Sequence, residues 1–340
     1  MYQKWYTNAS NMIPFRSFVK KKEPLITFTQ NTGYKKSMRM KTIKIAQWGG
    51  LHIAYMPLYI ADRLGLFEAQ GLKPFIYHAG NDDVIFDEVA QGRAHFGMGD
   101  PVFAALGQQK GIDARVVASL VTNTCMLGIT HHAEIKPFSQ VSGFVGLRVG
   151  TFPRPSTAFT LLNALKKRHK RLLKSMQIVE TEIGQQAYLL ASNKVDLILE
   201  LEPMVSMALH QGLHLVCNMG DFFQDALFTG LTTLHSTIEK DPELVAKTVL
   251  ALQHALTLCR THPEKAVSIG NELFPAIDKK IMKEAILRMV DLKGWPEQTV
   301  INPQAWMNLL KMRQDVGELD TLPPFDKVVD NQFAYAALEK

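Results

Sequence analysis

Short apolar runs alternate with longer amphipathic stretches from about residue 41 onward. Runs rich in β-branched and aromatic residues predict strands at 42–47, 75–78 and 95–98. Each is followed by a stretch with helical spacing, at 54–64, 82–91 and 102–109. Asp100 and Pro101 form a helix-start signal, an N-cap followed by a first-turn proline. Because strands and helices alternate, the pattern predicts a parallel α/β sheet.

The pattern starts again after Cys125 and changes after Asn218. Strands are expected at 145–149, 177–179 and 195–199, and helices at 156–167 and 185–191. The remaining chain is mostly helical, with helices predicted at 242–261, 278–291 and 303–316. The sequence therefore predicts two α/β lobes followed by a helical segment.

The composition agrees with a folded chain of two lobes. With 340 residues, 46% hydrophobic and 21% charged, the chain is long enough for more than one core. Residues 1–40 show no sustained periodicity, so we expect a poorly ordered N-terminal extension. They also lack the apolar core of a secretory signal, and no apolar run reaches the length of a membrane span.

The net charge of +6 comes largely from the N-terminal region and from the basic run at 166–171. That run lies at the end of a predicted helix, where cations complement the helix dipole, and it has no interleaved aromatic residues for base stacking. We therefore expect no nucleic-acid partner. The three cysteines, Cys125, Cys217 and Cys259, match no metal or redox spacing, so buried free thiols are expected, with no metal and no cofactor.

Four segments resemble, in the same order, the sulfonate, nitrate and thiamine-pyrimidine group of periplasmic solute-binding proteins. These segments span residues 43–72, 87–106, 142–165 and 191–204. The resemblance implies a type II periplasmic-binding-protein fold, in which each of two lobes is a mostly parallel sheet flanked by helices and two hinge crossovers join the lobes. It places lobe 1 at 41–125 and 228–340, and lobe 2 at 126–227.

The same resemblance implies the solute-binding subunit of an ABC-type importer. Such a protein captures a small organic ligand, for example a thiamine-pyrimidine-like heterocycle or a sulfonate, by hinge closure and without chemistry. Its partners are an ABC permease and an ATPase; we expect a monomer. The family implies a periplasmic location, but no signal peptide is visible, which leaves a cytoplasmic protein as the alternative.

An enzyme or a ligand sensor on the same fold is the alternative function. The enzymatic branch of the family makes the thiamine pyrimidine and relies on a lysine and a histidine after the third strand, and on a cysteine-rich segment. Residues 97–103 contain neither lysine nor histidine, and 218–230 contain no cysteine. The sequence also lacks a Gly-x-Ser-x-Gly elbow and a phosphate-binding loop. We therefore expect no catalytic residues.

Candidate ligand-binding residues follow the first predicted strand. Trp48 offers a stacking face, and the glycine loop containing Gly50 lets backbone N–H groups approach a ligand. His52 and Tyr55 come next and can direct polar groups into a cleft. The alternative is a tight strand-to-helix turn with Trp48 and Tyr55 in the core.

A second candidate group comes before the helix at 156–167. Arg154, Ser156 and Thr157 combine a cation with a helix N-terminus, an arrangement that favours an anionic group. Ser156 is equally suited to be the N-cap, with Arg154 solvated.

Two carboxylates argue against a bare oxyanion. Asp100 and Glu202 both fall at the ends of predicted strands, and at close range they repel anions. If they line the cleft, they favour a ligand with hydrogen-bond donors, such as an amino-heterocycle or a zwitterion. Asp100 has the alternative role of a helix cap.

Overall fold

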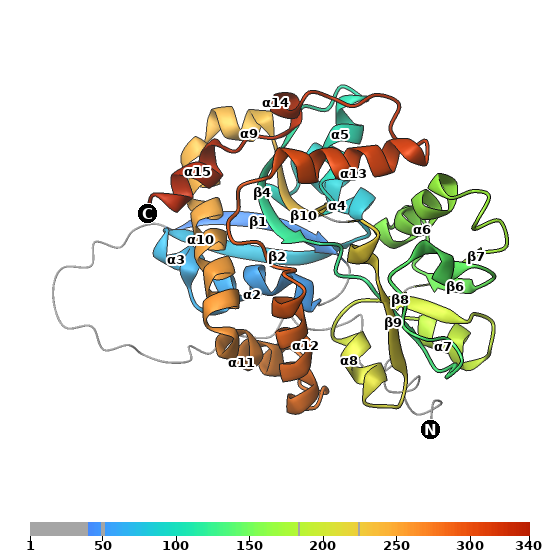
Figure 1. The fold of residues 1–340 in the computed structure, drawn as a ribbon. Helices are drawn as coiled ribbons and strands as arrows, with labels where there is room; N and C mark the ends of the chain where they lie inside the picture. Colours follow the sequence, from blue (N-terminus) through green and yellow to red (C-terminus); the bar gives the residue numbers. More distant parts are fainter. Residues whose placement is uncertain (1–39, 49–51, 183, 224) are drawn as a thin grey trace.

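The computed structural model describes residues 40–48, 52–182, 184–223 and 225–340, and it shows two α/β lobes side by side (Figure 1). Gly50 and the predicted N-terminal extension up to residue 39 lie outside the described residues. No helix among the described residues has the length and hydropathy of a membrane span.

The first sheet has the strand order β2-β1-β3-β10-β4. Four strands run parallel, and β10 is antiparallel to both of its neighbours. The strands are β1 (Lys41–Trp48), β2 (Leu72–Gly80), β3 (Phe96–Gly99), β4 (Ala114–Thr122) and β10 (Leu227–Leu234). The helices between them are η1 (Ile53–Tyr55), α2 (Met56–Arg63), α3 (Leu66–Ala69), α4 (Asp82–Ala90) and α5 (Val102–Gln108).

The second sheet repeats this plan in the order β7-β6-β8-β5-β9. Here β5 is the antiparallel strand. The strands are β5 (Leu127–Thr130), β6 (Arg148–Thr151), β7 (Gln177–Glu180), β8 (Leu197–Glu200) and β9 (His214–Asn218). The helices are η2 (Val141–Phe144), α6 (Thr157–Arg168), α7 (Gln186–Ala191), α8 (Met204–Leu209) and η3 (Met219–Asp221). The predicted fold class, two mostly parallel sheets flanked by helices, is confirmed.

The chain passes between the sheets twice, between β4 and β5 and again between β9 and β10. In both cases the strand that follows the crossing is the antiparallel one of its sheet. The two crossing segments are short and adjacent to strand ends, which is the arrangement that allows hinge motion between lobes.

The C-terminal helices return to the first sheet, as the orange and red ribbons beside the blue strands show (Figure 1). They are α9 (His235–Lys240), α10 (Pro242–Thr261), α11 (Pro263–Leu273), α12 (Lys279–Asp291), α13 (Pro303–Asp315), α14 (Phe325–Val328) and α15 (Gln332–Leu338). We use "first lobe" for the first sheet with α2–α5 and α9–α15, and "second lobe" for the second sheet with α6–α8. Two helices of the first lobe also touch the second, because α13 packs on α6 and α12 packs on α8.

The predicted state of the cysteines is confirmed. Cys125, Cys217 and Cys259 are buried free thiols. Burial raises the pKa of Cys125 and Cys217 to about 12, which keeps both as unreactive thiols at neutral pH.

Candidate functional site

A cavity lies between the two lobes and opens to solvent; its atom-free space, open solvent included, is about 640 Å³. The first lobe and the crossing segments contribute Trp48, His52, Ala54, Tyr55, Asn81, Asp82, Asp100, Met126, Phe228 and Thr229. The second lobe contributes Phe152, Pro153, Ser156, Thr157, Ala158 and Leu201.

The lining residues follow the carboxyl ends of parallel strands in both sheets. In the first sheet, Trp48 ends β1 and Asp100 follows β3. In the second, Phe152 follows β6 and Leu201 follows β8. Open α/β sheets bind ligands at this edge, so the cavity lies where the topology predicts a binding site.

Neutral aromatic rings form the walls of the cavity. The ring centroids of Trp48 and His52 lie 4.2 Å apart, and Trp48 meets Phe152 of the second lobe edge to face with centroids 6.5 Å apart. Burial, together with the nearby His78, lowers the pKa of His52 to about 4. The imidazole is therefore uncharged at neutral pH, and the walls offer flat surfaces on which a planar ligand can stack.

Tyr55 carries a hydroxyl group at the cavity and is also part of the core. Its ring is buried, and its hydroxyl shares a hydrogen bond with Thr229 of β10. Burial raises the pKa of Tyr55, and the charges of Asp82 and Asp100 add to the effect. The phenol therefore stays protonated; Tyr55 is a core residue that also lines the cavity, and its contact with a ligand stays a prediction.

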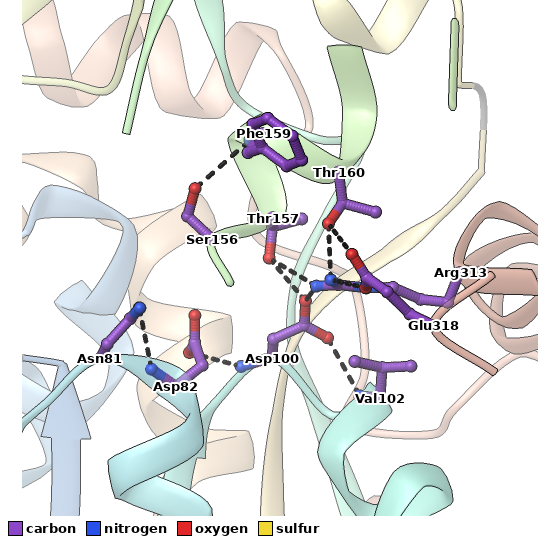
Figure 2. A network of polar contacts seen from close by, with 10 residues as sticks. All are labelled: Asn81, Asp82, Asp100, Val102, Ser156, Thr157, Phe159, Thr160, Arg313 and Glu318. Carbon is purple, nitrogen blue, oxygen red and sulfur yellow. Dashed lines mark hydrogen bonds and ion pairs between the residues drawn. The ribbon is translucent and has the colours of Figure 1, made fainter. Parts of the chain in front are cut away.

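Asp100 lines the cavity and also binds the first residue of α5, although the N-cap position predicted for Asp100 is taken by Pro101. Its Oδ1 accepts from Val102 N at 3.0 Å, and its Oδ2 accepts from Thr157 Oγ1 of the second lobe at 2.5 Å. The same Oδ2 forms an ion pair with Arg313 of α13 (Figure 2). The carboxylate of Asp100 is thus neutralised from the side away from the cavity.

Arg313 binds both lobes through its guanidinium group, which is fully buried. Besides Asp100, its Nη1 donates to Thr160 Oγ1 at 2.7 Å and to Glu318 Oε2 at 2.6 Å. Thr157 and Thr160 belong to α6, whereas Asp100 and Glu318 belong to the first lobe (Figure 2). This Arg313 cluster (Asp100, Thr157, Thr160, Arg313 and Glu318) therefore joins the lobes beside the cavity.

Asp82 is a lining residue that the sequence analysis missed. It begins α4 directly after β2, and its Oδ1 accepts from Asp100 N at 2.9 Å. Burial and, to a lesser extent, the negative charge of Asp100 together raise the pKa of Asp82 to about 7. The rule that pointed to the ends of β1 and β3 applies equally to β2, so the signal for Asp82 and its neighbour Asn81 was present in the sequence.

Two of the predicted residues do not reach the cavity. The side chain of Arg154 is 68% exposed and pairs with Glu180 at 3.0 Å, so it points along the surface of the second lobe. Glu202 is buried beneath α8, where it accepts from Ser206 Oγ at 2.9 Å and from Arg288 Nε at 2.7 Å. The guanidinium group of Arg154 and the carboxylate of Glu202 therefore already have protein partners.

The remaining predicted residues are brought together as expected, with Gly50 outside the described residues. Trp48, His52, Tyr55, Asp100, Ser156 and Thr157 all line the cavity. Ser156 is also the N-cap of α6, because its Oγ accepts from Phe159 N at 3.3 Å. Without Arg154, the α6 terminus lacks the cation that an anion site there would need.

A family model described as NMT1/THI5 like matches residues 52–266. The chain belongs to this family. Among curated proteins, it is 21% identical over 289 residues to YtlA of Bacillus subtilis (strain 168), which is named as a binding protein; the match covers 83% of this chain and 86% of YtlA. The resemblance seen in the sequence is confirmed.

Solved structures of similar fold include binding proteins and an enzyme. A protein from Bordetella bronchiseptica RB50 matches with a TM-score of 0.72 and 19% identity, covering 88% of this chain and 98% of that one. The alkanesulfonate-binding protein SsuA from Xanthomonas axonopodis pv. citri matches with a TM-score of 0.65 and 13% identity, covering 87% and 97%. The desulfurization enzyme DSZB matches at 0.63 with 14% identity, covering 88% and 99%. The two-lobed fold is therefore shared by proteins that bind and by one that catalyses.

Proposed function

We propose that this NMT1/THI5-like protein is the solute-binding subunit of an ABC-type importer. It captures a small organic ligand between its lobes and does no chemistry on it. The observation that carries the proposal is the cavity itself, whose walls come from the carboxyl ends of both sheets. A ligand there contacts both lobes at once and so favours their closed arrangement.

Some residues that line the cavity also form hydrogen bonds between the lobes, and these residues couple closure to ligand binding. Asp100 and Thr157 line the cavity from opposite lobes and are hydrogen-bonded to each other. The lobes can separate by rotation about the two crossings, one between β4 and β5 and the other between β9 and β10. Ligand binding and closure are then one linked equilibrium, in which a ligand stabilises the state that contacts it from both sides.

The partners and location follow from the same proposal. Solved structures of similar fold include the ligand-binding component of an ABC-type import system from Staphylococcus aureus and the periplasmic sulfonate-binding SsuA of Escherichia coli. By analogy, this chain works as a monomer outside the cytoplasmic membrane and delivers its ligand to a permease driven by an ATPase. This part rests on the relatives rather than on a feature of the cavity.

The lining of the cavity supports binding over catalysis. The described lining residues include no cysteine and no lysine, and the hydroxyls of Ser156 and Thr157 donate to Phe152 O and to the carboxylate of Asp100, which is already paired with Arg313. The single histidine, His52, has a pKa of about 4 because it is buried, which is far from the value that suits proton transfer at neutral pH. The groups present are suited to stacking and hydrogen bonding.

Native mass spectrometry of the protein purified from its own host tests the proposal. We expect one small molecule to be retained, and to be lost in Trp48→Ala while the circular dichroism spectrum stays unchanged. Trp306→Phe serves as a control, because Trp306 is fully buried, does not line the cavity, and its indole N–H makes no hydrogen bond among the described residues. Absence of any retained or added small molecule would refute a binding role, and conversion of the retained molecule into a second species over time would show an enzyme.

A further inference from the structure

The charged groups around the cavity are unusual for a fold whose solved relatives include proteins that bind sulfonate and nitrate. The described lining residues include two carboxylates, Asp82 and Asp100, and no lysine or arginine. Arg154, the cation expected at this site, lies on the surface. An oxyanion in this cavity would meet negative charge without a compensating cation.

The nearby positive charge of Arg313 is already paired with carboxylates of the protein. Its guanidinium group is fully buried and contacts both Asp100 and Glu318. One cation therefore faces three carboxylates when Asp82 is counted. His52 supplies no further positive charge, since burial keeps its imidazole neutral.

Asp82 has a free acceptor at the cavity. Its Oδ1 accepts from Asp100 N, whereas no hydrogen bond among the described residues involves its Oδ2, as Figure 2 shows for the residues it draws. The aromatic rings of Trp48 and Phe152 stand in the same cavity. These two rings meet edge to face at 76°, so a planar group packs beside them rather than between them, with an N–H donor at its edge directed to Asp82, and a positive charge on that group strengthens both contacts.

We propose that the cavity takes a small planar organic cation, anchored by a charge-assisted hydrogen bond to Asp82, and that it rejects sulfonates and other oxyanions. This inference rests on the proposed binding function and names the ligand chemistry of that same site. The preference comes from charge: the ligand supplies the second cation that Asp82, Asp100 and Glu318 lack.

Three ring compounds of nearly equal shape test the sign of the charge. Benzamidinium, benzamide and benzoate at 10 mM are compared by thermal unfolding and isothermal titration calorimetry. We expect benzamidinium to raise Tm and to bind, benzamide to bind at least tenfold more weakly, and benzoate to have no effect. Stabilisation by benzoate equal to or greater than that by benzamidinium, or no response to any of the three, would overturn the proposal.

A variant pair tests the anchor. Asp82→Asn keeps an Oδ1 acceptor for Asp100 N but removes the charge, and we expect benzamidinium affinity to fall about tenfold, which corresponds to about 1.4 kcal/mol. Asp87→Asn removes a carboxylate from the exposed face of the same helix and leaves affinity unchanged. Equal affinity in Asp82→Asn and the unaltered protein contradicts the role of Asp82.

The pH dependence gives a readout that needs no variant. The titratable and charged groups near Asp82 are Asp100, Arg313, Tyr55 and Asp83, the residue that follows Asp82 in the chain. Because the pKa of Asp82 is about 7, its carboxylate forms as the pH rises from 6 to 8, and benzamidinium affinity should rise over that interval while His52 stays neutral. Affinity that is flat or falls with pH contradicts the proposal.

The ligand retained from the host separates the two proposals. A retained organic cation supports both. A retained sulfonate or carboxylate keeps the binding function and overturns the cation preference, whereas an empty cavity that takes up no small molecule refutes the function itself.

Discussion

Two polar clusters join the lobes on opposite sides of the molecule, and they differ in what surrounds them. The Arg313 cluster includes two cavity residues, and its guanidinium group is 0% exposed. The second, which we call the Arg288 cluster (Glu202, Ser206 and Arg288), contains no lining residue, and its guanidinium side chain is 27% exposed. A buried charge depends on its partners far more than a half-solvated one. Under the proposed function, the first cluster links closure to the ligand, and the second holds the lobes independently of it.

The largest difference should appear when each arginine is replaced by methionine. Arg313→Met leaves Asp100 and Glu318 without their cation, and we expect the free energy of unfolding to fall by about 3–5 kcal/mol. Arg288→Met removes the cation from one carboxylate rather than two; that carboxylate, of Glu202, is 1% exposed but keeps two hydrogen bonds from Ser206, and a smaller loss of about 2–3 kcal/mol is expected. Urea unfolding followed by circular dichroism measures both. Equal losses would show that burial does not distinguish the clusters.

The sequence predicted most of the fold because local signals mark its elements. The strands that became β1 and β3 were placed within two residues of their observed bounds, since glycines and the Asp100–Pro101 pair delimit them. β4, β5, β9 and β10 were not predicted. These four strands flank the two crossings between the sheets, and the places of β5 and β10 depend on pairing with strands far away in the chain.

The difference between local signals and long-range contacts also explains which site residues could be predicted. Trp48, His52, Asp100 and Thr157 were found because they follow predicted strands or begin a helix. Arg313 was missed, since it is 213 residues from Asp100 and lies in a C-terminal helix where a cation is ordinarily solvated. The direction of Arg154 could not be predicted either, because a loop sequence does not specify which side of the strand end its side chain takes.

A smaller effect separates bonds that cross between lobes from those within one lobe. Thr157→Val removes the hydroxyl that donates to Asp100 across the cavity, and Ser206→Ala removes one that donates to Glu202 within the second lobe. Each should lower the free energy of unfolding by about 1 kcal/mol. Only Thr157→Val should weaken the binding of benzamidinium, by about fivefold, because only this substitution removes a hydrogen bond that holds the two lobes together. Calorimetric titration of both variants checks this, and equal affinities would contradict the link.

The smallest effect is expected at Arg154, the cation that the sequence placed at the ligand. Its partner Glu180 lies in the same lobe, and the side chain of Arg154 is 68% exposed. Arg154→Ala should therefore change the free energy of unfolding by less than about 1 kcal/mol. Since no lining residue depends on it, benzamidinium affinity and the host ligand retained in native mass spectrometry should stay the same. Loss of the retained ligand in Arg154→Ala would mean that the arginine turns into the cavity when ligand is bound. In that case the cavity would hold a cation after all, and the preference for a positively charged ligand would fail with it.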